Sequence, residues 1–189
     1  MGTMFDLEQF IADCKAALKQ DASHAFVQEV VARAVSDPVA VLKALGEPKQ
    51  AGMHGLYHSG ELTIVNVVWA PWMTLLPHNH RMWAVIGMYT GREDNIFWRR
   101  VPRGQGRELE AAGARALCET DAMPMGHDIV HSVTNPIPRL SGAIHVYGGD
   151  FFAVVRSEWD PETLREQPSS GEKMARRFEE ANALFVRRG

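Results

Sequence analysis

Apolar side chains recur every three or four positions through the first 46 residues, which is the spacing of one face of a helix. One series covers residues 7–18 and a second covers 26–35. A third, shorter helix is expected after Asp37, a suitable N-cap, with Pro38 in its first turn and Gly46 just past its end. The pattern therefore predicts three helices before the first strand.

From about residue 52 the pattern changes to short β-branched and aromatic runs separated by Gly, Pro and Asn. The candidate strands are residues 62–69, 81–89, 95–101, 129–135, 141–148 and 151–159. Many short strands at close spacing are typical of a sandwich or barrel. Beyond them, Asp160-Pro161 is expected to open a short helix, and apolar positions from Met174 to Phe185 predict a final amphipathic one.

The length and composition suit one globular domain. A chain of 189 residues can close a sizeable core, and its apolar fraction of 46% and charged fraction of 23% are ordinary for a soluble protein. We divide the domain into an N-terminal helical cap (1–50), a β barrel (51–160) and a C-terminal helical segment (161–189).

The charge pattern does not favour a nucleic-acid or membrane partner. The net charge is −3, and carboxylates are interspersed among the arginines. No apolar run reaches about 18 residues and no signal peptide is recognised at the start. Cys14 and Cys118 lie in different segments without Cys-x-x-Cys spacing, which fits a cytoplasmic protein in which both are core residues.

Candidate chemistry begins at His78 and His80, which stand two apart in an apolar run. Residues alternate faces along a strand, so both imidazoles should point the same way, on an inner face that Met82 and Ile86 continue. A buried imidazole needs a partner for each ring nitrogen, and a metal ion is one such partner. Two histidines bonded to backbone or water at a strand end are the alternative.

Two further segments add candidate ligands. Residues 123–136 hold a Pro-x-Gly turn followed by His131, and residues 143–148 hold His145 and Tyr147 on one strand face. In an antiparallel barrel such strands can be neighbours, so several histidines can meet at one point. This favours a metal site over a pair of structural histidines.

Together these motifs resemble the two cupin motifs, and within that superfamily those of the cysteine dioxygenase-like (thiol dioxygenase) family. The matching stretches are residues 57–69, 77–91, 131–135 and 145–147, within a resemblance that spans about residues 50–160. It implies a mainly β cupin fold, a double-stranded β-helix or jelly-roll barrel, with N-terminal helices and a C-terminal helix.

Carried over to this sequence, the resemblance implies iron(II) held by His78, His80 and His131, with zinc, nickel or manganese as alternatives. Many cupins add a glutamate shortly after the paired histidines, whereas thiol dioxygenases use three neutral histidines, and here no carboxylate stands in that region. The resemblance also implies that Tyr147 donates a hydrogen bond to oxygen at the iron or to the substrate, with His145 holding its orientation.

One departure concerns the substrate. The family member acting on cysteine carries an Arg just after the tyrosine of its first strand, whereas Ser59 is the nearest match after Tyr57 in this chain. A hydroxyl replaces a carboxylate-binding guanidinium poorly, which puts cysteine as the substrate in doubt. Arg81 should face away, and other arginines could reach the site only through a loop or bulge: Arg92, Arg99 and Arg100.

The substrate pocket is expected to include Tyr57, Ser59, Met82 and His127. His127 stands four residues before His131 and has two interpretations, a group at the pocket mouth or a solvated loop histidine. If Trp83 points outward, it covers the barrel or a homodimer interface.

The sequence thus predicts an enzyme, an iron-dependent dioxygenase that adds O2 to a small substrate, with a thiol as the favoured class. Two alternatives stay open. The same histidines could hold zinc, nickel or manganese for isomerisation or hydrolysis, or the protein could bind a metal and a ligand without turnover.

Overall fold

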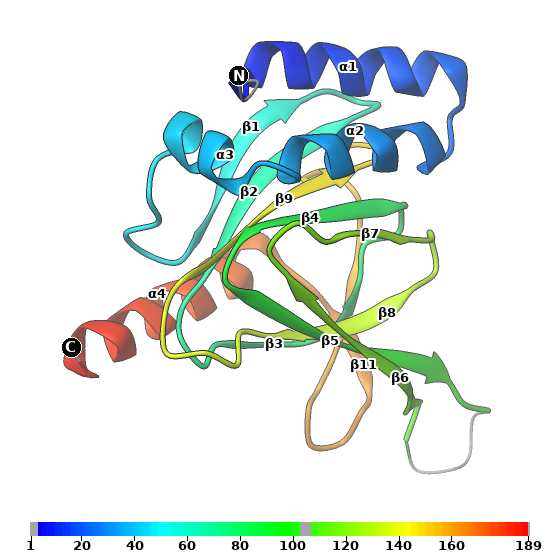
Figure 1. Cartoon of the computed structure of the whole chain (residues 1–189). Helices are drawn as coiled ribbons and strands as arrows, with labels where there is room; N and C mark the ends of the chain where they lie inside the picture. Colours follow the sequence, from blue (N-terminus) through cyan, green and yellow to red (C-terminus); the bar gives the residue numbers. More distant parts are fainter. Residues whose placement is uncertain (1–3, 103–106, 189) are drawn as a thin grey trace.

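Three helices, eleven strands and a final helix follow one another in the computed structural model, which describes residues 4–102 and 107–188 (Figure 1). The helices are α1 (Leu7–Gln20), α2 (Ala25–Val35), α3 (Pro38–Leu45) and α4 (Gly171–Arg188). The strands are β1 (Gly52–His58), β2 (Thr63–Trp69), β3 (Thr74–Asn79), β4 (Ala84–Thr90), β5 (Arg92–Arg100), β6 (Leu109–Cys118), β7 (Ala122–Met125), β8 (Val130–Thr134), β9 (Ser141–Tyr147), β10 (Ser157–Trp159) and β11 (Glu166–Pro168).

The strands form two antiparallel sheets that face each other. One sheet has the order β1-β2-β9-β4-β7 and the other the order β11-β10-β3-β8-β5-β6. From β2 to β10 the chain crosses between the sheets at every connection except β5–β6, so neighbours such as β3 and β8 or β2 and β9 are distant in sequence. This is the mainly β double-stranded β-helix, or jelly-roll barrel, that the sequence predicts, with helices before and after it.

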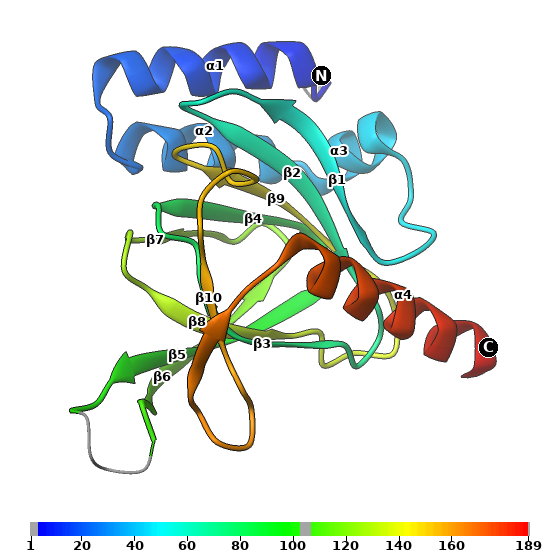
Figure 2. The same ribbon diagram turned by 180° about the vertical axis from the view of Figure 1, so that it is seen from behind.

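The five-stranded sheet is buried on both faces. Its outer face packs against α1, α2 and α3, which cover it as one layer (Figure 2), while its inner face forms the barrel core with the second sheet. Because every position is covered, β2, β4 and β9 show no polar alternation. The approach of α2 depends on Gly87 of β4, since a Cβ there would meet Val31 Cγ1 at 2.5 Å.

The helix boundaries follow from their caps. Asp6 and Asp37 each accept a hydrogen bond from a backbone amide of the first turn of α1 and α3. Gly46 ends α3 with φ +84°, a conformation that favours glycine. The three predicted helices are confirmed.

The predicted helix at Asp160-Pro161 is wrong. Asp160 does accept hydrogen bonds from the backbone amides of Glu162 and Thr163, as an N-cap would. The chain makes only a turn there, with Leu164 at φ +51°, and then pairs as β11 with β10. The C-terminal segment is therefore helical only from Gly171 onward, and the predicted strand 151–159 shortens to β10.

The sequence predicts that the paired histidines and residues 82–88 lie on one face of the same strand, and this also needs correction. β3 ends at Asn79, and the chain turns through Arg81, at φ +56°, before β4 begins in the other sheet. His78 and Ile86 both face the barrel interior, but from opposite walls. The prediction that both side chains point inward is correct, and the prediction that they share a strand is wrong.

Helix α4 packs against the end of the barrel. Phe178 stacks on Trp69 with ring centroids 5.6 Å apart, and the side-chain amide of Asn182 bonds the backbone of Ala51 in both directions. The carboxylate of Glu158, 2% exposed, accepts from Arg177 at 3.2 Å. No helix in the described part of the chain combines the length and apolar character needed to cross a bilayer.

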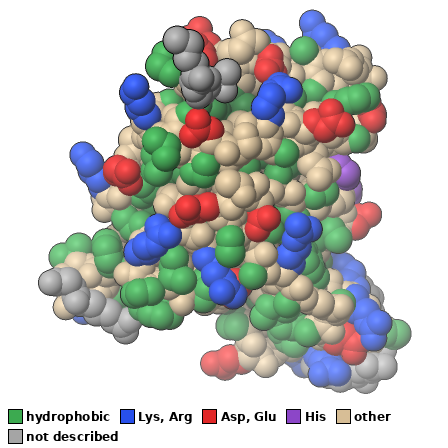
Figure 3. Space-filling view, in the orientation of Figure 1, with side chains coloured by type: hydrophobic (Ala, Val, Ile, Leu, Met, Phe, Trp, Pro, Cys, Tyr) green, Lys and Arg blue, Asp and Glu red, His purple; other side chains and the backbone are tan. Residues whose placement is uncertain are grey.

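Surface features agree with the charge pattern. On the face in Figure 3, basic and acidic side chains are interspersed.

Cys118 is exposed, so the expectation that it is a core residue is wrong, whereas Cys14 is buried. Trp83 donates its Nε1–H to the carbonyl of Ala22 at 3.0 Å, so it packs beneath the α1–α2 loop.

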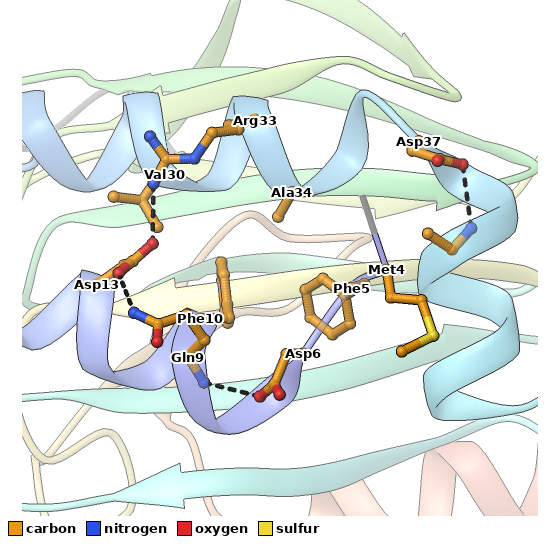
Figure 4. A pocket seen from close by; sticks show the side chains of 11 residues that line it. Met4, Phe5, Asp6, Gln9, Phe10, Asp13, Val30, Arg33, Ala34 and Asp37 are labelled. Carbon is orange, nitrogen blue, oxygen red and sulfur yellow. Dashed lines mark hydrogen bonds and ion pairs between the residues drawn. The ribbon is translucent and has the colours of Figure 1, made fainter. Parts of the chain in front are cut away.

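A depression of about 250 Å³ lies between α1, α2 and α3 (Figure 4). Its polar side chains bond one another: Asp6 accepts from the backbone amide of Gln9, and Asp13 accepts from the side chains of Gln9 and Arg33. These contacts cap and join the helices on the outer side of the five-stranded sheet, whereas the candidate histidines face the barrel interior.

Candidate metal centre

Three buried histidines converge inside the barrel. His78 lies on β3 and is paired directly with His131 on the neighbouring strand β8, and His80 follows the end of β3. Their exposed fractions are 7%, 1% and 5%, respectively. The Nε2 atom of His80 lies 3.3 Å from Nε2 of His78 and 3.2 Å from Nε2 of His131. Residues 53 positions apart in sequence are thus brought together by the β3–β8 register.

The hydrogen bonds made by the Nδ1 atoms determine which ring nitrogens are free to bind a metal. Nδ1 of His78 donates to the carbonyl oxygen of Leu76 at 2.9 Å, and Nδ1 of His131 donates to Oδ1 of Asn95 at 2.6 Å. Both Nε2 atoms therefore present lone pairs to His80. A single proton on His80 can satisfy only one of them, whereas a metal ion can accept a lone pair from all three rings.

The electrostatic environment keeps these rings neutral. Burial lowers the pKa of His78 to about 4. Burial, followed by the charges of the neighbouring histidines, holds the pKa values of His80 and His131 well below the ordinary value. Neutral imidazole is the form that binds a metal. Three nitrogens that each lie about 2.1 Å from one ion are roughly 3.0–3.4 Å apart, so the observed spacing fits a metal ion.

Tyr147 and His145 lie beside this cluster. Both are on the inner face of β9, and the Tyr147 hydroxyl lies 3.2 Å from Nδ1 of His145. The rings of Tyr147 and His80 are 5.1 Å apart, edge to face. Burial raises the pKa of Tyr147, so its hydroxyl stays protonated at neutral pH. The predicted pair therefore lies within reach of a ligand bound at the histidines.

A small cavity of about 20 Å³ adjoins the histidines. It is lined by Met53, Val67, Trp69, Leu75, His78, His80, His131, Val133, His145, Tyr147, Phe151 and Met174. That volume suits a group about the size of a water molecule. A larger substrate requires side chains such as Phe151 or Met174 to move aside.

The four predicted pocket residues lie elsewhere. Tyr57 and Ser59 line a separate depression under α1. A β-bulge between Gly55 and Tyr57 reverses the alternation of β1, so Tyr57 joins the outer face while Met53 stays inside. Ser59 serves the β1–β2 turn, where its hydroxyl bonds the backbone of Leu62.

Met82 and His127 are also separate from the cavity. Met82 packs in the core near the turn after His80. His127 is exposed in a loop, where its Nδ1 lies 2.8 Å from the carboxylate of Asp128. The solvated-loop interpretation of His127 is the one that its surroundings favour.

Two polar residues behind the cluster were missed by the sequence analysis. Glu93 and Asn95, both 0% exposed, point inward from β5. Asn95 accepts from His131, and its side-chain nitrogen donates to Glu93 at 3.0 Å. Their alternation within a strand was a usable signal, because two polar residues on an inward face need partners inside the barrel.

A third missed residue is Arg156. Its guanidinium lies over the ring of Phe151, 3.7 Å from the centroid, and Phe151 in turn stacks on Tyr147 at 4.1 Å. Burial lowers the pKa of Arg156. Burial is the main cause of the lowered pKa of His78, and the charge of Arg156 adds to it; at Tyr147 the same charge opposes the rise in pKa that burial causes.

The arginines considered from the sequence are bonded on the outside of the barrel. Arg92 pairs with Asp94, Arg99 with Glu110 and Arg100 with Glu166. Arg81 is exposed, but because it lies in the turn after β3, with φ +56°, and not because of strand alternation. Arg156 lies within residues 151–159, which the sequence predicts as a strand, but nothing in that pattern distinguishes its side chain as a candidate for the site.

No family model matches this sequence. Similar solved structures include an RmlC-like cupin family protein from Methanocaldococcus jannaschii (9% identity over 56% of this chain and 86% of that chain, TM-score 0.46). A double-stranded β-helix protein from Klebsiella pneumoniae (12% identity, 62% and 87%, TM-score 0.46) and a DMSP lyase from Ruegeria pomeroyi (16% identity, 60% and 53%, TM-score 0.46) are also similar. At these identities and TM-scores the likeness assigns neither a family nor a function. The strand order itself, two facing antiparallel sheets between which the chain crosses, gives this chain the double-stranded β-helix architecture.

Proposed function

We propose that this protein is an iron(II)-dependent dioxygenase with a three-histidine site, acting on a small thiol that carries an anionic group. The observation behind the proposal is the buried cluster of three neutral imidazoles, with Tyr147 and Arg156 beside it. The fold and the three-histidine cluster together support a metal-dependent cupin. The choice of iron and of a thiol goes further and rests on the charge of the ligand set.

The ligand set favours an anionic substrate. Three imidazoles carry no charge, so a bound iron(II) ion keeps its full positive charge and attracts a thiolate. Three protein ligands leave half of an octahedral shell open for substrate and dioxygen. When bound, iron would supply the redox chemistry, while the barrel supplies a dry cavity walled by apolar side chains such as Val67, Leu75 and Val133.

Arg156 supports a substrate with a carboxylate. The first strand lacks the arginine that the resemblance led us to seek, but the guanidinium of Arg156 lies over the ring of Phe151, which lines the cavity. A partly buried guanidinium binds a carboxylate strongly because both charges are shielded from water. Cysteine and 3-mercaptopropionate both combine a thiol with a carboxylate.

The first test compares metal content and oxygen uptake. Wild-type protein purified anaerobically should contain about one iron per chain and consume oxygen with 3-mercaptopropionate or cysteine. His131→Ala should lose both properties. His127→Ala, four residues away and exposed, is the matched control and should keep both. Zinc, nickel or manganese without oxygen uptake would contradict the dioxygenase proposal and favour Lewis-acid chemistry.

The second test concerns the anionic group of the substrate. Arg156→Gln should raise the KM for 3-mercaptopropionate by about 10- to 100-fold, because it removes a charge-assisted hydrogen bond. Oxidation of 2-mercaptoethanol, which has no carboxylate, should change little. Arg99→Gln on the barrel exterior is the control. Equal losses with both thiols would show that Arg156 does not bind the carboxylate.

A further inference from the structure

Glu93 is a fully buried carboxylate surrounded by hydrogen-bond donors. Nε1–H of Trp69 donates to its Oε2 at 2.7 Å, and the side-chain amide of Asn95 donates to its Oε1 at 3.0 Å. Nε2 of His145 lies 3.6 Å from Oε2. Among described residues, no Lys or Arg nitrogen lies within 4.0 Å of this carboxylate. Burial alone would raise the pKa of Glu93, but His145, Asn95 and Trp69 outweigh it and lower the pKa, so the group is ionised at neutral pH.

An ionised carboxylate determines the tautomer of His145. Carboxylate oxygens only accept hydrogen bonds, so the ring nitrogen that faces them is stabilised when it carries the proton. That nitrogen is Nε2, which is buried 3.6 Å from Oε2 of Glu93 and makes no hydrogen bond in the described structure. When the neutral ring carries its one proton on Nε2, Nδ1 is unprotonated, and the hydroxyl of Tyr147, 3.2 Å away, donates to it.

The direction of this hydroxyl matters for the site. If Tyr147 donates to His145, its oxygen presents lone pairs to the cavity, where it can accept a hydrogen bond from a thiol or another acidic group of the substrate. This is the reverse of the arrangement that the resemblance implies, in which Tyr147 donates toward the ligand. The direction of the Tyr147 hydroxyl is therefore set by Glu93, which faces the other ring nitrogen of His145.

The same carboxylate also reaches a metal ligand. The Asn95 nitrogen that donates to Glu93 fixes the orientation of the Asn95 amide, and its oxygen accepts from Nδ1 of His131. That bond leaves Nε2 of His131 free for a metal. One carboxylate on β5 thus holds the tautomers of two histidines, one from β8 and one from β9.

We propose that Glu93 is a positioning residue that fixes His145 with its proton on Nε2, directs the Tyr147 hydroxyl toward His145, and holds His131 through Asn95. The tautomers are properties of the protein itself. Only the expected effect on turnover rests on the proposed function.

The direct test is nitrogen-15 NMR of the histidine rings, which distinguishes protonated from unprotonated nitrogens. Metal-free and zinc-loaded protein are both diamagnetic and suitable, and His145→Gln assigns the signals of His145. We expect His145 to carry its proton on Nε2 in the wild type. A proton on Nδ1 would overturn the proposal without any variant at Glu93.

Glu93→Gln provides a second test that does not depend on substrate. A glutamine has one acceptor and one donor where the carboxylate has two acceptors. If its NH2 group faces His145, the proton of His145 must move to Nδ1. If it faces Asn95, the Asn95 amide must rotate and His131 must change tautomer. We expect one of these two histidines to switch, and unchanged tautomers at both would contradict the proposal.

Glu158→Gln is the matched control, because Glu158 is also a buried carboxylate but bonds Gln167, Lys173 and Arg177. It should leave both histidine tautomers unchanged, and a switch there would mean that any loosened carboxylate has this effect. In iron-loaded enzyme, Glu93→Gln should lower kcat about 10- to 100-fold with a smaller change in KM. A protein that has the expected tautomers but oxidises no thiol would contradict only the proposed function.

Discussion

Two identical side chains can have different chemistry because their neighbours in the fold differ. His127 and His131 stand four positions apart, yet the first is exposed beside Asp128 and the second is 1% exposed with a partner at each ring nitrogen. Burial removes the water that would stabilise an imidazolium ion. A buried, neutral histidine is thereby prepared for a metal, and an exposed one is not.

The lowered histidine pKa values predict how the metal-free protein responds to acid. In the unfolded chain these histidines take up protons near pH 6.5, whereas folded His78 does so only near pH 4. Between these values the unfolded state binds more protons, so stability falls as the pH is lowered. We expect a loss of about 1 kcal/mol per buried histidine between pH 7.5 and 5.5, measured by urea unfolding.

Two variants check the source of this acid sensitivity. His131→Ala should show a shallower pH dependence, since it removes one of the groups responsible. His127→Ala should follow the wild type. If the wild type is equally stable at both pH values, the three rings are not held neutral in the folded protein.

Among helices and strands, a capping residue predicted the element correctly where its hydrogen-bond partner lies within the same turn and no distant strand competes. Asp37 caps α3 as predicted because the amide it binds lies within the same turn. Asp160 carries the same signal but only closes a turn, since the pairing of β11 with β10 takes the following residues into the sheet. The bulge in β1 likewise reverses the face of Tyr57 and has no signature in the alternation.

The contact between α2 and β4 gives a prediction at this scale. Gly87→Ala would place a methyl group 2.5 Å from Val31 Cγ1 and 2.9 Å from Val35 Cγ1. The helix must shift outward or the strand inward, so we expect a loss of about 1–3 kcal/mol in the free energy of unfolding. The measurement is chemical denaturation.

Gly55→Ala in β1 is the matched control, because an added Cβ there meets nothing within 4 Å. It should leave stability unchanged or slightly raised. Similar losses in the two variants would mean that the cost arises from the strand backbone and not from the helix contact.

For the whole molecule, the last helix supports the site from outside. Phe178 of α4 is 5% exposed and stacks on Trp69, whose indole donates to Glu93. Phe178→Ala should lower the free energy of unfolding by about 3 kcal/mol and also weaken metal retention. Leu184→Ala on the same helix, where the side chain is 54% exposed, should change stability by less than about 0.5 kcal/mol.

The prediction separates two effects of α4. If Phe178→Ala is destabilised but retains metal as the wild type does, the helix closes the barrel without supporting the network behind the histidines. If both quantities change, the stack on Trp69 connects the end of the chain to the site.

The sequence by itself predicted the first three helices, the last helix, most strands and a cluster of histidines inside a sandwich or barrel. The jelly-roll class and the pairing of Tyr147 with His145 came from the resemblance. The helices and strands depend on local periodicity and capping residues, which are present in short windows of the chain. The histidines could be recognised because imidazoles are rarely placed in apolar strands without a partner.

The tertiary structure alone decided the surroundings of these residues. Glu93 of β5 contacts His145, Arg156 lies over Phe151 from the segment before β10, and Tyr57 turns away because of one extra residue in its strand. Such positions depend on sheet register, bulges and turns between distant segments. Those features are set by packing over the whole barrel, which no single stretch of sequence contains.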